Sequence, residues 1–571
     1  MKYKIKRQSK QELEPEEILL DSKKRKRTGE GRLEVPIKNT VFSIIFFIIL
    51  LLLFSLFLKS FYLVEARGEE LKKEAINNYL RVILIEAPRG IIYSSEGKPL
   101  VKNVQKNLEK KDEKGNKIVT RKFNRVYLDS KYFSHILGYV NEVSTEEIKK
   151  DSYYQLGDRI GREGIEREYE KFLRGRKGRR ERVVNAKGKI LSDEVKNEPV
   201  QGNNLILNIN AALQKKLYDT IKEKVPDKNA VGIAINPQNG KILALVSIPS
   251  YDNNLISEKY NEYINDSRKP LLNRAIAGRY PSGSVIKPLI GAAALQENII
   301  TPQTKINCQG RILIPNPYGP FTVKKDWKVH HITDLKKAIA ESCNVYFFIV
   351  GGGGDKDING REIEGLGIER IKRYLDLFYI EKELGIDLPG EKVGFVPTKQ
   401  WFDKVRKKKE QRNWSIADVY DVSIGQGYFL TTPLHLAVAL ASIANGGKIY
   451  QPQIVDKIID PTGRVIKNIQ PKVLKENFIK KENIESIREG MRECVISPSG
   501  SCRQLQTLPV SSGGKTGTAE AAGEPHAWFV AFAPYENPEI LILVFVENGG
   551  GGARVAEPIA KEVLKWYFTR R

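Results

Sequence analysis

The longest apolar stretch of the chain lies near its N-terminus. Residues 41–58 contain only two polar side chains, Ser43 and Ser55, and a second apolar segment, FYLV, follows at 61–64. A run of this length can cross the hydrocarbon core of a bilayer, which is about 30 Å thick. No later stretch matches it. The pattern therefore predicts one membrane-spanning helix over residues 39–64.

Charged residues flank this stretch unevenly. A basic cluster at 23–27 precedes it, whereas Glu65, Glu69 and Glu70 follow it. Because positive charge favours the cytoplasmic side of a membrane, we expect residues 1–38 to be a cytoplasmic tail and the rest of the chain to lie outside. A cleaved signal peptide is the alternative, but the apolar run and its polar leader are longer than is usual for one.

Residues 65–200 form a second region of mixed helices and strands. Residues 65–82 predict a helix that leaves the membrane. Residues 102–122 are mostly Lys, Glu, Asn and Asp, which is typical of an exposed loop or hairpin. No combination of residues here indicates chemistry, although Arg89 and Glu166 could form a structural pair.

From residue 201 onward, the pattern is typical of an α/β domain. A hairpin turn, PQNG, joins two apolar strands near residue 238. The predicted strands lie at 205–209, 231–236, 241–247, 512–519, 527–532 and 540–546, and helices lie at 211–223 and 558–568. Residues 301–480 predict mostly helical segments with long loops. This order predicts an antiparallel sheet sandwiched between helices, with an all-helical part.

Composition limits the function. The chain has 571 residues, too many for one compact core, and a formal net charge of +25. This charge would suit nucleic acid, anionic lipid or cell-wall polymer equally well. Because the predicted topology places the bulk of the chain outside the membrane, we expect no nucleic acid partner.

The four cysteines are Cys308, Cys343, Cys494 and Cys502. An even number in an oxidising compartment permits disulfides. Cys494 and Cys502 flank the turn SPSGS and could form a bridge. Two unpaired buried thiols explain the same residues equally well.

Ser284 and Lys287 are the first candidates for catalysis. The turn PSG precedes Ser284, and an apolar run of small residues at 289–295 predicts a buried helix whose first turn contains the serine. The unpaired N–H groups of a helix N-terminus favour developing negative charge. Lys287 lies one turn away, so its amine could reach the serine hydroxyl. Taken alone, a helix cap explains Ser284 equally well. A second match, Ser95 to Lys98, is a polar turn.

Ser342 and Asn344 are the second pair of candidates, in front of the aromatic run YFF. Two residues apart in a loop, both side chains could point into one cleft. Ser342 could relay a proton there, and Asn344 could hold a substrate amide. A helix-capping role would also explain this tripeptide.

The third group is Lys515, Thr516, Gly517 and Thr518, on a predicted strand after two glycines. Lys515 and Thr516 would present a cation and a hydroxyl to a substrate carboxylate. Gly517 would let a ligand backbone approach the strand edge closely. The alternative for Lys515 is an edge-strand lysine that discourages aggregation.

These groups would act on one another. A second cation near Lys287, together with burial, would lower the pKa of Lys287 and free it to act as a base. The backbone N–H groups of Ser284 and Thr518 could form an oxyanion hole.

In this order the three groups match the Ser-x-x-Lys, Ser-x-Asn and Lys-Thr-Gly pattern of serine acyl-transferases that act on D-Ala-D-Ala or β-lactams. The chain resembles the class B penicillin-binding proteins of the elongation type, from the membrane anchor to the C-terminus. Further stretches that carry this resemblance are PRG at 88–90 with Gly97, GREGIE at 161–166, NRA at 273–275, DLPGE at 387–391, IGQG at 424–427 with Thr432 and Pro433, and HAWF at 526–529.

The resemblance implies a dimerisation-type pedestal at 65–200 and a transpeptidase domain at 201–571, held at the cell membrane by a single pass. It implies a peptidoglycan D,D-transpeptidase that crosslinks stem peptides during cell elongation and is inhibited by β-lactams, with D,D-carboxypeptidase activity as a side reaction. No cofactor would be required. The expected partners are a separate membrane glycan polymerase and the scaffold proteins of the elongation machinery.

Carried onto this chain, the family mechanism assigns a role to each residue. Ser284 would attack the penultimate D-Ala carbonyl of a stem pentapeptide, and Lys287 would take the serine proton. Ser342 would relay a proton to the leaving amine. An amine of a neighbouring strand would then resolve the acyl-enzyme.

Two features depart from the family pattern. Ser282 stands where the family usually has a second proline, and the pedestal is short, with its charged 102–122 segment in place of a larger head. Three alternatives remain open: a β-lactamase, a β-lactam sensor and a catalytically idle cell-wall scaffold. The first needs a base that activates water and the second a cytoplasmic output domain, and the sequence identifies neither.

A metal site is also conceivable beside the second pair of candidates. Cys308, Asp326, His330 or His331, and Cys343 fall within one region, and their sulfur, imidazole and carboxylate groups suit zinc. The spacing is not that of a zinc finger, so the ligands would have to converge through the fold. A Cys308–Cys343 disulfide and unrelated residues are the alternatives.

Two other features favour ordinary structural roles. Asp355, Asp357 and Asn359 resemble the start of a calcium-binding loop, but Leu366 stands where the closing Glu belongs, so a polar surface loop is favoured. His435 lies in an apolar helical stretch and is predicted to be a core residue.

Overall fold

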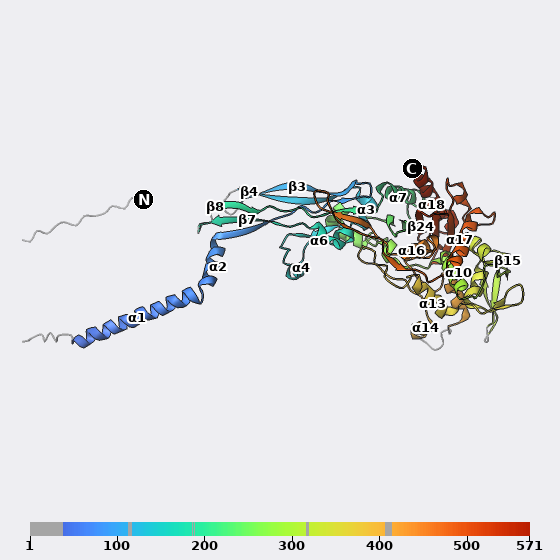
Figure 1. Cartoon of the computed structure of the whole chain (residues 1–571), viewed down its shortest axis with the longest axis horizontal. Coiled ribbons are helices and arrows are strands. Elements are labelled where there is room, and N and C mark those ends of the chain that lie inside the picture. The colour runs from blue at the N-terminus through green and yellow to red at the C-terminus, as the bar shows by residue number, and fades with distance from the viewer. Residues whose placement is uncertain are drawn as a thin grey trace, which may run out of the picture. The chain divides into compact units, whose positions relative to one another are not determined.

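The computed structural model describes residues 38–111, 117–185, 187, 189–315, 319–405 and 414–570. They divide into two compact units (Figure 1). The first contains the N-terminal residues to Arg81 with 182–192, and the second contains 82–181 and the chain from Asp193 onward. Except for Lys38, the predicted cytoplasmic tail lies outside the described residues.

The first unit contains the predicted membrane helix. Helix α1 (Asn39–Glu65) has 27 residues and is long and apolar enough to cross a membrane. At 1.5 Å per residue it spans about 40 Å, more than the hydrocarbon core requires. Helix α2 (Gly68–Tyr79) follows, as the sequence predicts.

A six-stranded sheet organises the pedestal. Its order is β20 (Val465–Asn468), β19 (Val455–Ile459), β9 (Asn204–Leu207), β2 (Ile92–Tyr93), β3 (Pro99–Lys111) and β4 (Lys117–Tyr127). Only β2 and β9 pair in parallel. The charged segment at 102–122 therefore contributes to two antiparallel strands, β3 and β4, and residues 112–116 between them lie outside the described residues. Strands β19 and β20 belong to the predicted transpeptidase region. The sequence did not indicate that this region contributes strands to the sheet of the pedestal.

The rest of the pedestal consists of short elements. These are β1 (Leu80–Ile85), α3 (Ser130–Leu137), β5 (Val140–Glu142), α4 (Thr145–Lys150), β6 (Arg159–Gly161), α5 (Gly164–Glu168), α6 (Glu170–Leu173), β7 (Gly178–Val184) and β8 (Ile190–Asn197).

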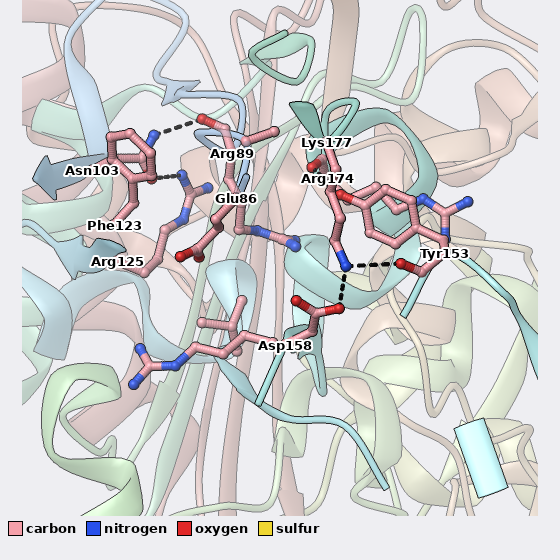
Figure 2. Close-up of a pocket in the computed structure, with 12 residues that line it drawn as sticks. Glu86, Arg89, Asn103, Phe123, Arg125, Tyr153, Asp158, Arg174 and Lys177 are labelled. Carbon is pink, nitrogen blue, oxygen red and sulfur yellow. Dashed lines mark hydrogen bonds and ion pairs between the residues drawn. The ribbon is translucent and has the colours of Figure 1, made fainter. Parts of the chain in front are cut away.

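The predicted pair of Arg89 and Glu166 is confirmed, with 2.7 Å between Nη2 and Oε2. Glu166 is fully buried and also accepts a hydrogen bond from Arg125, so its charge is compensated. Figure 2 shows Arg125 donating to the side chain of Asn103, which donates in turn to the carbonyl of Arg89.

A five-stranded antiparallel sheet forms the centre of the C-terminal region, as predicted. Its order is β11 (Ile242–Ile248), β10 (Ala230–Ile235), β24 (Ile540–Val546), β23 (His526–Ala533) and β22 (Gly513–Ala519). Helices α7 (Ala211–Lys224) and α18 (Gly552–Thr569) cover one face, and α16 (Pro433–Ala444) packs on the other. The C-terminal helix begins six residues before Pro558, where the sequence placed its start.

Residues 301–480 contain more strands than predicted. The helices are α11 (Leu335–Ala340), α12 (Asn344–Gly352), α13 (Gly367–Leu377), α14 (Lys399–Val405), α15 (Ile416–Ser423) and α16. The same region contains the strand pairs β12 (Ile306–Cys308) with β15 (His331–Thr333), β13 (Arg311–Ile314) with β14 (Thr322–Lys325), β16 (Asp355–Lys356) with β17 (Glu362–Ile363), and β18 (Ile449–Tyr450) with β21 (Val473–Lys475). The remaining helices of the domain are α8 (Ile256–Asn265), α9 (Arg274–Ala277), α10 (Lys287–Gln296) and α17 (Lys481–Ile496).

The structure agrees with the structural roles predicted for the calcium-like segment and for His435. The calcium-like segment forms the turn between β16 and β17, where the Asp357 carboxylate accepts hydrogen bonds from the backbone of Asn359 and Arg361. His435 is fully buried in α16 and bonds to Thr432 and to the carbonyl of Lys382. Burial lowers the pKa of His435 to about 4, so it is a neutral core residue at physiological pH.

Candidate active site

Ser284 lies in a short turn that leads directly into α10. The turn, Gly283–Ile286, is a 3-10 helix, so the predicted helical start is correct with a tighter first turn. Gly283 has φ +54°, and a Cβ there would lie 2.5 Å from the carbonyl oxygen of Thr518. The glycine therefore lets the turn lie against β22. In the described part of the chain the Ser284 hydroxyl makes no hydrogen bond, and Ser284 faces an open cleft.

Lys287 is fully buried beside the second pair of predicted residues. Its ammonium nitrogen lies 2.7 Å from the carbonyl oxygen of Ser342 and 2.7 Å from the side-chain oxygen of Asn344. Neither of these hydrogen bonds goes to Ser284. Ser342 has φ +60°, a left-handed conformation that turns its carbonyl inward before α12 begins.

Burial governs the protonation of both lysines. It lowers the pKa of Lys287 from 10.5 to about 8, opposed by Asp326 and by the buried thiols of Cys343 and Cys308. It lowers the pKa of Lys515 well below its usual range, and the nearby charge of Lys287 adds to this effect. A lysine with a pKa of about 8 is neutral in roughly a tenth of molecules at pH 7, enough to serve as a base.

Lys515, Thr516, Gly517 and Thr518 lie on β22, the edge strand of the five-stranded sheet. The side chain of Lys515 is fully buried and donates to the carbonyl of Thr516 at 2.9 Å. An exposed lysine that guards the edge is therefore excluded.

Gly517 is required by packing within the protein. A Cβ on Gly517 would lie 2.6 Å from a methyl group of Val285, which follows the nucleophile. This glycine thus permits a close approach between β22 and the turn of Ser284, and the approach of a ligand backbone stays a prediction from the sequence.

One cleft brings the predicted residues together. It has a volume of about 940 Å³. Six of the predicted residues line it: Ser284, Ser342, Asn344, Thr516, Gly517 and Thr518. The two predicted lysines, Lys287 and Lys515, are fully buried and do not belong to its lining.

Three contacting groups were not identified as site residues from sequence. Ser501 lies 2.8 Å from the Thr516 hydroxyl, in the turn closed by the Cys494–Cys502 disulfide, which the structure contains. The carbonyl of Gly425 accepts a hydrogen bond from Gly283 at 2.9 Å. Gln426 bonds to the carbonyl of Thr518 and to the backbone of Glu520. The only signal for the last two was their place in the IGQG stretch.

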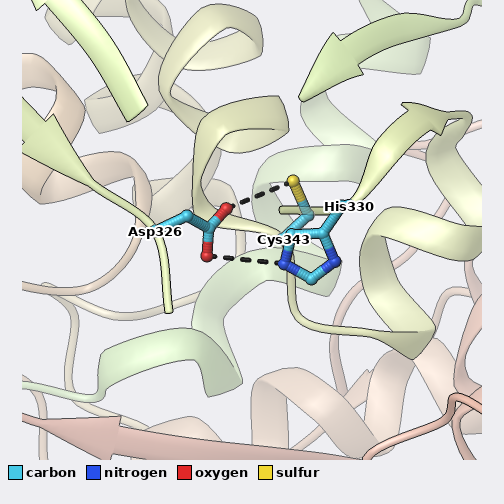
Figure 3. Close-up of side chains that lie close together, drawn as sticks. All are labelled: Asp326, His330 and Cys343. Carbon is cyan, nitrogen blue, oxygen red and sulfur yellow. Dashed lines mark hydrogen bonds and ion pairs between the residues drawn. The ribbon is translucent and has the colours of Figure 1, made fainter. Parts of the chain in front are cut away.

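Asp326 holds the start of α12 in place. Its carboxylate accepts the backbone N–H groups of Asn344 at 2.6 Å and Val345 at 2.9 Å. Figure 3 shows it beside Cys343 and His330, and one donor atom from each of these three residues lies within 4.8 Å of the others. The buried Nε2 of His330 lies 3.5 Å from a carboxylate oxygen of Asp326, the contact dashed in Figure 3, and makes no hydrogen bond among the described residues, as expected of a potential metal ligand.

The other two predicted metal ligands, Cys308 and His331, lie outside this group of three. Cys308 is buried, and both Cys308 and Cys343 are free thiols, so the alternative of a disulfide between them is excluded. Burial raises the pKa of the Cys343 thiol, and a hydrogen bond with Cys308 adds to the rise. His331 is exposed on β15 and lies outside the metal-ligand group among the described residues.

Comparisons with known proteins agree with this geometry. A family model described as the penicillin binding protein transpeptidase domain matches residues 230–565, and one described as the penicillin-binding protein dimerisation domain matches 107–207. The peptidoglycan D,D-transpeptidase MrdA of Haemophilus influenzae is 34% identical over 481 residues, which cover 79% of this chain and 70% of that protein.

Two solved structures are similar over most of the chain. The complex between the penicillin-binding protein PBP2 and MreC from Helicobacter pylori matches with a TM-score of 0.71 and 26% identity, covering 86% of this chain and 99% of that one. A structure described as the structural coordination of polymerization and crosslinking by a peptidoglycan synthase complex matches with a TM-score of 0.72 and 26% identity, covering 93% and 99%.

Proposed function

The chain belongs to the family of penicillin-binding protein transpeptidases, and we propose that it crosslinks peptidoglycan through an acyl-enzyme on Ser284. It is a serine-type D,D-transpeptidase of cell elongation. Relatives named as transpeptidases weigh against the β-lactamase, sensor and idle-scaffold alternatives. One observation supports the assignment of the nucleophile: the unbonded hydroxyl of Ser284 faces the cleft that Ser342, Asn344 and β22 also line.

Acylation follows from this arrangement. The oxygen of Ser284 attacks the carbonyl carbon of the penultimate D-Ala, and the bond to the terminal D-Ala nitrogen breaks. Lys287, in its neutral form, takes the serine proton, and Ser342 relays a proton to the departing amine. The backbone N–H groups of Ser284 and Thr518 stabilise the negative charge on the carbonyl oxygen.

Substrate binding falls to β22 and α12. Lys515 and Thr516 provide a cation and a hydroxyl for the terminal carboxylate of the donor stem peptide, and the bound carboxylate favours the charged form of Lys515 against the effect of burial. Asn344 holds a substrate amide at the start of α12. An amine of a second strand then attacks the acyl-enzyme and forms the crosslink.

Mass spectrometry of the full-length chain in detergent tests the nucleophile. After incubation with benzylpenicillin, we expect one covalent adduct on the parent and none on Ser284→Ala. The matched control is Ser95→Ala, which removes the serine of the second Ser-x-x-Lys match and should leave the adduct intact. An adduct on Ser284→Ala, or none on the parent, would overturn the assignment.

The domain limits and the membrane orientation are part of the same proposal. The pedestal spans 65–200 and the transpeptidase domain 201–571, which the family-model matches at 107–207 and 230–565 support. The N-terminus lies in the cytoplasm and the catalytic domain outside, because basic residues precede α1 and acidic ones follow it. We expect an impermeant cysteine-labelling reagent on whole cells to modify Ser95→Cys but not Ser9→Cys.

The partners follow from the named relatives. A relative's structure contains MreC and another describes a synthase complex that couples polymerization to crosslinking. A membrane glycan polymerase and an elongation scaffold protein are therefore the proposed partners of this chain, and peptidoglycan stem peptides and β-lactams its ligands.

A structural zinc ion accompanies, but does not perform, the reaction, which needs no cofactor. Asp326, His330 and Cys343 would hold it, and these donor types suit zinc. Cys308 lies outside this group of three but forms a hydrogen bond with Cys343, which makes it the candidate fourth ligand. The ion would fix Asp326 and so the start of α12. We expect about one zinc per chain by elemental analysis of purified protein, and loss of it in His330→Ala. Background zinc in the parent would contradict the site.

A further inference from the structure

One ion pair lines the catalytic cleft and has no part in the steps above. The ammonium group of Lys324 lies 2.6 Å and 2.7 Å from the two carboxylate oxygens of Asp421. Lys324 belongs to β14 and Asp421 to α15, and both side chains line the cleft that contains Ser284. Each side chain is a quarter exposed, so the pair lies at the cleft wall rather than in the core.

Asp421 is connected closely to the nucleophile. Four residues after Asp421, the carbonyl of Gly425 accepts a hydrogen bond from the N–H of Gly283, the residue that precedes Ser284. The next residue, Gln426, donates a backbone N–H to the carbonyl of Asp421 and bridges by its side chain to Thr518. These contacts hold the backbone of Asp421 close to both Ser284 and the end of β22.

The reaction requires a second substrate that the assigned residues do not bind. The donor stem peptide presents a carboxylate, which Lys515 and Thr516 accommodate. The acceptor stem peptide presents a primary amine, which is an ammonium ion at neutral pH. A carboxylate at the cleft wall is the chemical complement of that group.

We propose that Asp421 binds the acceptor amine, and that Lys324 occupies the same position until the acceptor displaces it. This inference rests on the proposed function and adds to it the residue that recognises the acceptor amine. Lys324 resembles the acceptor chemically, since both present a primary ammonium on a flexible chain.

The surroundings of Asp421 favour a bound cation. Burial raises the pKa of the Asp421 carboxyl, Lys324 opposes this rise, and the neighbouring acids Asp418 and Glu520 add to it. A carboxylate in such surroundings gains more than an exposed one from a cationic partner. Because the incoming ammonium ion takes the place of the Lys324 ammonium, the Asp421 carboxylate keeps a cationic partner when the two exchange.

The step balances as an aminolysis. The acceptor ammonium first gives up one proton to solvent or to Asp421. Its nitrogen then forms a bond to the acyl carbon, the ester bond to the Ser284 oxygen breaks, and the second nitrogen proton returns to that oxygen. The products are an amide crosslink and the free serine.

The test compares aminolysis with hydrolysis in the full-length chain in detergent. A thioester of an N-acyl-D-alanine generates the acyl-enzyme. The acceptor is the tripeptide L-Ala-γ-D-Glu with a third diamino acid, tested with lysine and with meso-diaminopimelate. The readouts are the ratio of amide to acid product, the KM for the acceptor, and the rate of benzylpenicillin acylation.

We expect Asp421→Asn to raise the acceptor KM and lower the product ratio by about tenfold, with benzylpenicillin acylation within twofold of the parent. Lys324→Met should lower the acceptor KM about threefold, and the double variant should lose that gain, because both residues act at one position. The matched control, Lys325→Met, removes the neighbouring lysine, which has no ion pair among the described residues.

Two outcomes would overturn the inference. One is an unchanged product ratio in Asp421→Asn. The other is an equal fall in aminolysis and in benzylpenicillin acylation, which would assign Asp421 a structural role only. Absence of benzylpenicillin acylation in the parent would instead contradict the proposed function itself.

Discussion

Burial of the Lys287 side chain suits it to the role of base proposed above. The sequence suggested burial and the charge of Lys515 together as the causes of a lowered Lys287 pKa; in the structure burial lowers it and Asp326 partly opposes the effect, whereas the charge of Lys287 adds to the lowering of the Lys515 pKa. The hydrogen bonds of Lys287 go to Ser342, the proposed proton relay, and to Asn344, the proposed ligand of a substrate amide.

This predicts a pH dependence of acylation. Only the neutral amine of Lys287 accepts a proton, and its pKa is about 8 rather than the ordinary 10.5. The rate of benzylpenicillin acylation should therefore rise about tenfold from pH 6 to pH 7 and level off above about pH 8. Stopped-flow fluorescence measures this profile, with reagent hydrolysis without enzyme as the control. A rate that still climbs towards pH 10 would show that burial does not depress the pKa.

The site residues differ in how far sequence alone could identify them. Ser284, Lys287, Asn344 and Lys515 were predictable because their chemical types recur at fixed short spacings. Asp421 and Ser501 were not, because their roles depend on contacts between segments distant in sequence. Gly517 was identified, but for a different reason than the structure gives, since sequence does not show that Val285 packs on it.

At the scale of elements, the nucleophile turn is held between β22 and the segment that contains Gly425. A Cβ on Gly425 would lie 2.3 Å from the Ser282 hydroxyl and 2.4 Å from the carbonyl oxygen of Gly283. Since these atoms cannot move without moving Ser284, this close packing keeps the nucleophile in place.

Gly425→Ala should therefore lower the rate of benzylpenicillin acylation by about 100-fold, because a shift near 1 Å at a reacting group has this effect. The matched control is Gly367→Ala at the start of α13. Its φ of +69° is close to the +73° of Gly425, but a Cβ would meet nothing within 4 Å. It should cost about 1 kcal/mol of stability and leave acylation unchanged. Equal acylation by both variants would contradict the role of packing.

The disulfide is a second element-scale constraint. Cys494 at the end of α17 joins Cys502 across eight residues, and Ser501 within this loop contacts Thr516. Loss of the bridge increases the conformational entropy of the unfolded chain. The free energy of unfolding should therefore fall by about 2.5 kcal/mol. We expect this loss in Cys494→Ser/Cys502→Ser by urea denaturation. Reductant should destabilise the parent to the same extent and the variant not at all; a parent insensitive to reductant would be inconsistent with a structural role.

Strands were predictable where they are long and apolar. All three strands between 513 and 546 are almost wholly buried, so their composition marks them directly. The strands between 306 and 475 were missed because several have only two or three residues, and the side chains of β14 are mostly exposed. Their pairing depends on partners that no local pattern reveals.

At the scale of the whole molecule, the predicted boundary at residues 200 and 201 divides one sheet. Strand β9 lies between β2 of the pedestal and β19 of the transpeptidase region, with Leu205 and Leu207 fully buried. Beyond the sheet, Tyr169 donates a hydrogen bond to the buried carboxylate of Asp387, which also accepts the N–H groups of Ile454 and Val455. The pedestal therefore completes the structure around Asp387.

A chain truncated to residues 201–571 should accordingly be less stable than one of residues 65–571. Removal of β2 exposes the edge of β9 and its buried leucines, which favours aggregation and lowers the unfolding temperature by at least about 5 °C. Differential scanning calorimetry and light scattering measure both effects. Tyr169→Phe in the longer chain separates the lost hydrogen bond from the lost sheet, and should cost only about 1 kcal/mol. Equal unfolding temperatures for the two truncated chains would mean that the transpeptidase domain folds independently of the pedestal, with the shared sheet contributing nothing to its stability.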